Sequence, residues 1–246
     1  MNKPTYSPIV ELRRYTLHPG RREDLIELFD REFVESQEAV GIQVIGQFYD
    51  LDDPDQFVWL RGFNDMPARE HSLHAFYGGP VWKMHRDAAN ATMIDSDNVL
   101  LLRRVHSTSG FSLSSKSRPA RGSHASQDGF VTATIYYSNK PVTTDFINYF
   151  ENVVHPELME ADVSVLAYFA TEDSPNTFPQ LPVREGENVF VWFAGFQDQE
   201  AYKSYLTKLR ESKRWNSEIE MYLKKHLQGK PEVLRLTPTP RSWLSG

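Results

Sequence analysis

The chain of 246 residues contains no cysteine, which excludes several kinds of chemistry at once. Disulfide bonds, thiolate catalysis and cysteine-ligated zinc or iron–sulfur centres are all ruled out. The sequence also lacks any apolar run approaching the roughly 20 residues that a membrane-spanning helix needs. Its first residues, MNKPTYSPIVELRRY, hold no apolar core typical of a signal peptide. We therefore expect a cytoplasmic protein without a membrane span.

A basic excess is missing as well. Lysine and arginine total 27 against 33 acidic residues, which gives a formal net charge of −6. Proteins that bind nucleic acid normally carry a basic excess or stripe, so no nucleic-acid partner is expected. With 40% hydrophobic and 13% aromatic residues, the chain can build a proper core, either as one large domain or as two of about 120 residues.

The composition changes abruptly in the middle of the chain. Residues 106–127 contain eight serines, three basic residues and no acidic residue. Such a segment buries too little apolar surface to hold itself in place, so it predicts a flexible linker. The linker divides the chain into a first domain, residues 1–105, and a second, residues 128–246.

The two halves repeat each other. The stretch FVWLRGFND, Phe57–Asp65, recurs as FVWFAGFQD, Phe190–Asp198, at a constant offset of 133 residues. Nearer the start of each half the offset is 121, which pairs Val10 with Val131. The Pro-rich stretch Glu172–Glu187 absorbs the difference, as expected for an insertion in a surface loop.

Each half follows the order strand, helix, strand, strand, helix, helix, strand. In the first half, alternating and helical periodicities predict strands at Ile9–Leu17, Ile42–Tyr49, Gln56–Phe63 and in NVLLLRR, with helices at Arg21–Val40, after Asp65 and at Val81–Met93. A βαββαβ order predicts a ferredoxin-like layer with helices on one sheet face. We therefore predict an α+β fold, in which two ferredoxin-like units pack sheet to sheet as a pseudo-dimeric α+β barrel. The sequence leaves open whether these pseudo-dimers associate further into homo-oligomers.

The first half resembles the NIPSNAP family in three motifs: IVELRRYTLHPGRREDLIELF, FVWLRGFND and FYGGPVW. The resemblance implies a dimeric α+β barrel with ferredoxin-like subunits. The second half keeps the FVW junction but has TATIYYSNKP in place of the opening motif, so it looks like a diverged copy. Related superfamily members include cofactor-free monooxygenases, haem-binding enzymes and plain ligand binders, so the fold alone selects no function.

Strand alternation separates the two faces of the predicted sheet. We expect Val10, Leu12, Val58 and Leu60 to face the helices. The other face would then point into the cavity between the two sheets, with Glu11, Arg13, Tyr15, Gln43, Gln47, Tyr49, Trp59, Arg61 and Phe63. This set predicts a site for a small planar or anionic metabolite, bound through Glu11, Arg13, Gln47, Tyr49, Trp59 and Arg61. The alternative is a polar interface between the sheets, and a register shift of one residue would exchange the faces.

The repeat indicates where a specialised role lies. Residues shared by both halves, such as Trp59 and Trp82, are most simply explained by the fold that the two halves have in common. Several polar residues of the first half are replaced in the second: Arg13 by Thr134, Arg61 by Ala194, His71 by Ser204, His74 by Thr207 and His85 by Glu218. A functional site is therefore expected in the first half alone.

Histidines are the remaining candidates for metal ligands, haem ligands or catalytic bases. A metal site from His71, His74 and His85 lacks the HExxH pattern, and a haem ligand would have to be His85 or His155. We expect neither a metal nor a cofactor. The alternative to simple binding is a cofactor-independent monooxygenase or isomerase-like enzyme acting on an aromatic or enolic substrate. Its catalytic residues would be His85, His71 and Tyr15, close to Arg13.

Overall fold

The computed structural model describes residues 7–112, 118–123 and 128–245. The first half contains β1 (Ile9–Leu17), α1 (Arg22–Leu28), the π-helical turn η1 (Phe29–Phe33), α2 (Val34–Glu38), β2 (Gln43–Asp50), β3 (Gln56–Phe63), α3 (Met66–Tyr77), α4 (Pro80–Asn90) and β4 (Met93–Arg104). No helix in the described part of the chain is long and apolar enough to cross a bilayer.

The second half repeats this order. It contains β5 (Phe130–Ser138), α5 (Thr144–Tyr149), η2 (Phe150–Val154), α6 (His155–Glu160), β6 (Ser164–Thr171), β7 (Asn188–Phe196), α7 (Gln199–Glu211), η3 (Trp215–Ile219), α8 (Glu220–His226) and β8 (Glu232–Pro238). The π-helical turns η1 and η2 lie at equivalent positions in the two halves. Because both copies carry it, this irregularity belongs to the shared fold.

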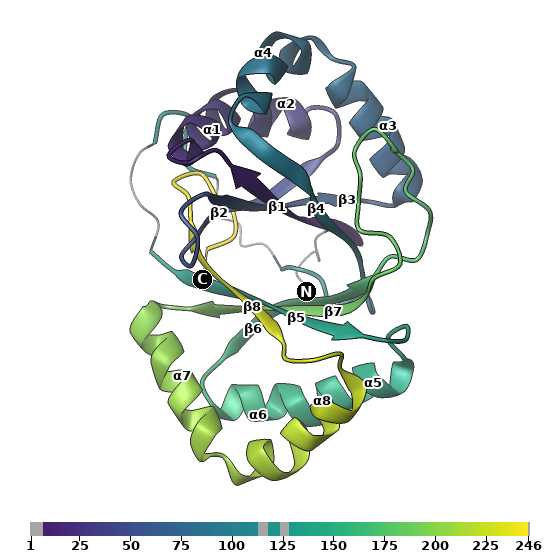
Figure 1. Ribbon diagram of the computed structural model, residues 1–246, viewed down its shortest axis with the longest axis vertical. Coiled ribbons are helices and arrows are strands. Elements are labelled where there is room, and N and C mark those ends of the chain that lie inside the picture. Colours follow the sequence, from purple (N-terminus) through teal and green to yellow (C-terminus); the bar gives the residue numbers. More distant parts are fainter. Residues whose placement is uncertain (1–6, 113–117, 124–127, 246) are drawn as a thin grey trace.

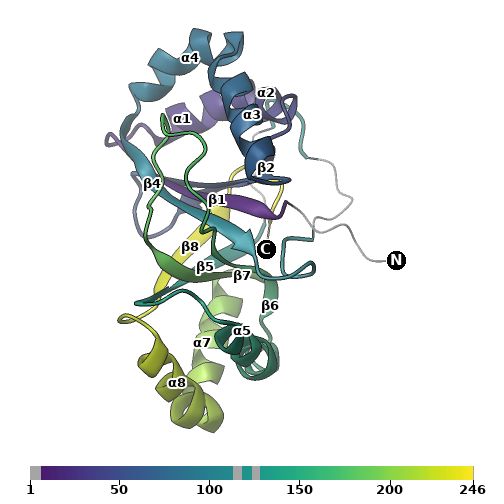
Figure 2. The same cartoon turned by 90° about the vertical axis from the view of Figure 1, so that its right-hand side faces the viewer.

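Eight antiparallel strands close into one barrel in the order β1-β3-β2-β8-β5-β7-β6-β4. Each half supplies four neighbouring strands, and the halves join through β2 with β8 and β4 with β6. Figures 1 and 2 show helices α1–α4 on one outer side of the barrel and α5–α8 on the other. The predicted pseudo-dimeric α+β barrel is thereby confirmed.

The pairing register confirms the internal repeat at single residues. Arg13 lies opposite Trp59 in the first half, and its equivalent Thr134 lies opposite Trp192 in the second. The predicted helix start at Asp65 is confirmed too, because its carboxylate accepts a hydrogen bond from the Ala68 amide at 2.7 Å.

The assignment of the two sheet faces was wrong. Val10, Leu12, Val58 and Leu60 point into the barrel, where they form one apolar core with second-half residues such as Val131 and Phe193. The set that includes Tyr15 and Trp59 instead packs against the helices of its own half. Both faces of this sheet are covered, so alternation separates them without saying which one is inside. The space between the sheets is a packed core of aliphatic and phenylalanine side chains.

The described part of the predicted linker is attached to the barrel. Phe111 is buried in the barrel core, and the Ser109 carbonyl accepts a hydrogen bond from the Tyr168 amide at 2.8 Å. Arg118 donates to the Val44 carbonyl at 2.6 Å. Residues 113–117 and 124–127 of the predicted linker lie outside the described residues.

Candidate ligand-binding site

A cluster of four charged residues lies between the first-half sheet and helix α3. Glu11 on β1 accepts from Arg13 at 2.5 Å, from Arg61 on β3 at 2.7 Å and from Arg69 on α3 at 2.6 Å. All four side chains have an exposed fraction of 0%. The pairing of β1 with β3 sets Glu11 directly opposite Arg61, and Arg13 follows two residues after Glu11 on the same face of β1.

The cluster is strongly unbalanced in charge. Burial alone would raise the pKa of Glu11, but Arg61, Arg13 and Arg69 together hold that pKa well below its usual range. Burial alone would lower the pKa of Arg13, yet Tyr15 and Glu11 raise it, so Arg13 stays charged. Three guanidinium groups thus surround one carboxylate and leave a net charge of about +2 in the interior.

Several hydrogen-bond donors around this cluster have no acceptor among the described residues. They are one terminal nitrogen, Nη2, of each of Arg13, Arg61 and Arg69, and the indole Nε1 of Trp59. A buried donor without a partner costs about 1–3 kcal/mol, and more when it is charged. Four such donors in one place indicate a site built for an acceptor from outside the protein.

Two tyrosine hydroxyls connect the cluster to a pocket. Arg13 donates from Nε to the Tyr15 hydroxyl at 2.9 Å, and Arg61 donates from Nη1 to the Tyr77 hydroxyl at 3.3 Å. Burial raises the pKa of Tyr15, and the nearby Arg13 only partly opposes this. Tyr15 is therefore a neutral phenol that accepts from Arg13 and keeps its own proton for another acceptor.

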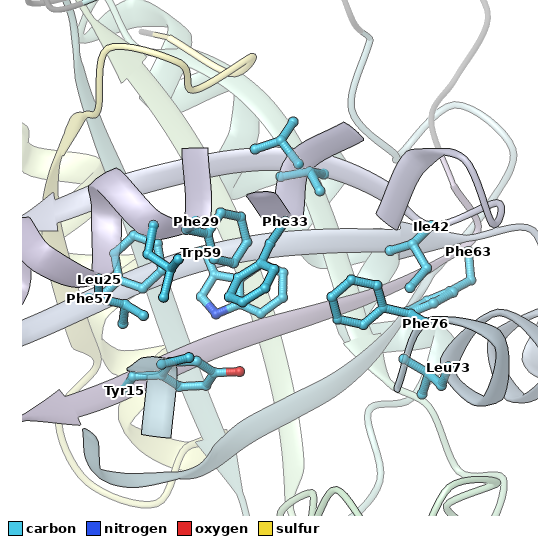
Figure 3. Packing of buried hydrophobic residues seen from close by; sticks show 14 of the residues in the cluster. Tyr15, Leu25, Phe29, Phe33, Ile42, Phe57, Trp59, Phe63, Leu73 and Phe76 are labelled. Carbon is cyan, nitrogen blue, oxygen red and sulfur yellow. The ribbon is translucent and has the colours of Figure 1, made fainter. Parts of the chain in front are cut away.

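The pocket lies between the sheet and the helices and has a volume of about 80 Å³. Tyr15, Trp59, Tyr77 and Gln37 line it with polar groups, and four further aromatic rings contribute to its wall: Phe29, Phe33, Phe76 and Trp82. Figure 3 shows Tyr15, Trp59, Phe29, Phe33 and Phe76 gathered on this side of the sheet. The ring centres of Tyr15 and Trp59 are 5.9 Å apart, and those of Phe29 and Trp59 are 4.8 Å apart.

A wider vestibule of about 480 Å³ adjoins this pocket. Tyr77, Trp82 and Leu181 line both spaces, so they mark the passage between them. His74 and Phe178 line only the vestibule. Together the two spaces have the size and the mixed aromatic and polar walls of a small-molecule site.

Two predicted binding residues lie elsewhere. Gln47 donates to the Asp30 carboxylate at 2.5 Å, and Tyr49 lines a separate cavity of about 410 Å³ that also includes Asp30 and Arg241. Burial raises the pKa of Asp30 to about 6, with Gln47 and Arg241 opposing the shift. The structure therefore brings Glu11, Arg13, Tyr15, Trp59 and Arg61 together and leaves Gln47 and Tyr49 apart.

The three histidines of α3 and α4 occupy different places. His71 is exposed on α3, and His85 lies on α4 with its Nε2 3.6 Å from the Glu32 carboxylate. His74 contacts the ring of Phe178 in the vestibule, with 4.8 Å between ring centres. The described residues contain no group of three or more His, Asp or Glu side chains arranged to hold a metal ion.

Sequence reasoning missed Arg69 and Tyr77. Arg69, Leu73 and Phe76 are all buried and follow the spacing i, i+4, i+7 on α3. An arginine on the apolar stripe of a helix was the available signal, because such a residue needs a buried partner. Nothing in the local sequence indicated which strand would supply that partner.

The equivalent position in the second half carries no charged cluster. There, Thr132 pairs with Ala194 where Glu11 pairs with Arg61, and Thr134 stands for Arg13. Tyr136 and Trp192 keep the places of Tyr15 and Trp59 and pack in an apolar core. The aromatic frame is thus common to both halves, while the charges belong to the first.

The closed barrel with helices outside and a pocket between sheet and helices defines a protein of the dimeric α+β barrel class. Among solved structures, the chain is similar to a candidate monooxygenase from Lactobacillus acidophilus NCFM, with a TM-score of 0.54 and 15% identity over 95% of this chain and 94% of the other. It is also similar to an anthrone oxidase-like protein, with a TM-score of 0.54 and 12% identity over 97% and 94%. A third similar structure is the encapsulated DyP-type peroxidase from Mycobacterium smegmatis, with a TM-score of 0.55 and 10% identity over 99% and 98%.

At these identities the likeness shows the fold alone. The curated proteins give no match. The NIPSNAP family model matches residues 10–107. The first half of the chain therefore matches the model of the family that its sequence motifs resemble.

Proposed function

We propose that this protein binds a small planar anion in the pocket between the first-half sheet and its helices. The observation that supports it most directly is the buried net charge of about +2 formed by Glu11, Arg13, Arg61 and Arg69, with unpartnered donors on each guanidinium. An uncompensated charge in the interior is costly, so an anionic ligand would relieve it. The ligand class is the one that the sequence predicted, but the proposed site lies on the helix side of the first-half sheet and not between the two sheets.

Recognition would use the polar wall of the pocket. The hydroxyls of Tyr15 and Tyr77 and the indole nitrogen of Trp59 can each donate to an oxygen of the ligand. The guanidinium groups directly behind them polarise both hydroxyls, which strengthens their hydrogen bonds to an anion. The aromatic side chains around this wall suit a flat ring, because ring pairs gain from edge and offset contacts.

A second function, a cofactor-independent monooxygenase or isomerase-like enzyme, has one observation in its favour. The same polarised donors would stabilise the enolate or phenolate that forms when an acidic substrate loses a proton. The base would be His74, because it lines the vestibule, whereas His71 lines neither space and His85 faces the Glu32 carboxylate. Simple binding stays first because Tyr15, a buried titratable group that lines the pocket, is held neutral by its raised pKa.

Calorimetric titration with 2-naphthoate and its neutral isostere 2-naphthamide tests the proposal. We expect the anion to bind at least about 10-fold more tightly, since a hydrogen bond to a charged group contributes about 1.5–3 kcal/mol. Tyr15→Phe should weaken binding of 2-naphthoate about 10-fold. The matched control Tyr136→Phe changes the same position of the second half and should leave the affinity unchanged. Equal affinities for anion and amide would refute the proposal.

A further inference from the structure

One wall of the site comes from the second half of the chain. The segment between β6 and β7, residues Glu172–Glu187, is here called the cap loop. Its two ends pair with β4 of the first half: the Glu172 amide donates to the Leu101 carbonyl and the Arg184 amide to the Val99 carbonyl, each at 2.9 Å. Figure 2 shows this green segment rising from the second-half sheet along β4 toward the first-half helices. The loop is therefore fixed against the half to which it does not belong.

The tip of the cap loop closes the vestibule with apolar side chains. Phe178 is buried and stacks on Tyr77, with 5.7 Å between ring centres and 27° between ring planes. Leu181 is half-buried and lines both the pocket and the vestibule. A ligand that extends outward from the Tyr15 hydroxyl therefore meets these two side chains.

The cap loop also holds one of the three arginines. Arg69 donates from Nη1 to the side-chain oxygens of Asn176 and Thr177, at 3.0 and 3.1 Å. Asn176 in turn donates to the Leu181 carbonyl at 2.9 Å, which fixes the curvature of the tip. Arg69 thus joins the cap loop to Glu11 at the centre of the charged cluster.

The reciprocal arrangement is absent from the described residues. The corresponding connection in the first half, residues 51–55, is short, and its Asp52 pairs with Arg235 on β8. The second half has Thr132 and Ala194 where a charged cluster would form. Among the described residues, the first-half site therefore has both the charged cluster and a covering loop, and the equivalent place in the second half has neither.

We propose that the cap loop of the second half determines which ligands the first-half site accepts, with Phe178 and Leu181 limiting their length. This inference rests on the proposed function and gives the diverged second half a role in the site. The cap loop would favour a planar anion with two fused rings over a planar anion with three fused rings. Asn176 is a positioning residue, since it acts through Arg69 and the shape of the tip.

The test compares dissociation constants for 2-naphthoate and anthracene-2-carboxylate in the full-length protein. Wild type should prefer the two-ring acid, and Phe178→Ala should shift the ratio of the two constants at least 10-fold toward the three-ring acid. Leu181→Ala should shift the ratio in the same direction. Leu51→Ala, in the short loop of the first half, is the matched control and should leave the ratio unchanged.

The outcomes separate the two proposals. If wild type binds neither acid, the proposed function is wrong and this inference ends with it. If wild type binds 2-naphthoate and both cap-loop variants keep the wild-type ratio, the cap loop does not select the ligand, while the anion site stands. If circular dichroism shows Phe178→Ala to be unfolded, the ratio in Leu181→Ala decides alone, and an unchanged ratio overturns the inference.

Discussion

Replacing Arg13 by methionine separates the binding role of the charged cluster from its structural role. Arg13 is one of three guanidinium groups around Glu11, and all of them are fully buried. Its removal lowers the buried net charge from about +2 to about +1, while Glu11 keeps Arg61 and Arg69. We therefore expect the free energy of unfolding to change by less than about 1 kcal/mol, because the charge relief offsets the lost ion pair.

Ligand affinity, in contrast to stability, should fall strongly. A ligand oxygen bound to the Tyr15 hydroxyl would lie about 6 Å from the Arg13 guanidinium, and two unit charges at that distance interact with about 3 kcal/mol at an effective dielectric constant of about 20. The dissociation constant of 2-naphthoate should thus rise by about 100-fold. Urea denaturation measures the stability, and calorimetric titration measures the affinity.

Glu11→Gln provides the matched comparison. It removes the only carboxylate of the cluster and leaves three buried guanidinium groups facing one another, so we expect a loss of about 3–5 kcal/mol in the free energy of unfolding. The reasoning is refuted if Arg13→Met loses as much stability as Glu11→Gln and still binds 2-naphthoate with wild-type affinity.

Three further predictions concern pH and helix starts. Because the pKa of Glu11 is lowered in the folded state, its contribution to stability is full above the unfolded value of about 4.5 and is lost as the pH falls below it; urea midpoints between pH 6 and 3 should show this loss. The pKa of Asp30 is raised from 3.8 to about 6 in the folded state, so its ionisation costs stability that grows between these two pH values and is complete above them; Asp30→Asn should gain about 3 kcal/mol at pH 8 but almost nothing at pH 4. Asp65→Ala and Asp198→Ala each remove a helix cap and should each lower the free energy of unfolding by about 1 kcal/mol by urea denaturation; a loss in only one half would contradict the equivalence of the two caps.

The repeat made most of the fold predictable. Two copies of one strand and helix order, each with an aspartate before its helix, fix both the units and their pseudo-dimeric pairing. Helix boundaries followed from local signals, such as Pro80 after the glycine pair, where α4 begins. These features depend on neighbours in the chain, and a sequence displays such neighbours directly.

The site was predictable only in part. Alternation placed Glu11, Arg13 and Arg61 on one face correctly, and the repeat correctly marked the first half as the charged one. It was wrong to expect that face inside the barrel, because Val10 and Leu12 find a second apolar sheet there and pack against it. The contact between Arg69 and Asn176 joins residues 107 positions apart, and no periodicity reveals such a pair.

The most direct test of the central claim is the position of a bound planar anion. In a crystal grown with 6-bromo-2-naphthoate, we expect the carboxylate within hydrogen-bond distance of the Tyr15 and Tyr77 hydroxyls. The anomalous signal of bromine should then lie in the vestibule, near Leu181. A bromine signal inside the barrel or beside Asp30, with the pocket between sheet and helices unchanged, would contradict the account.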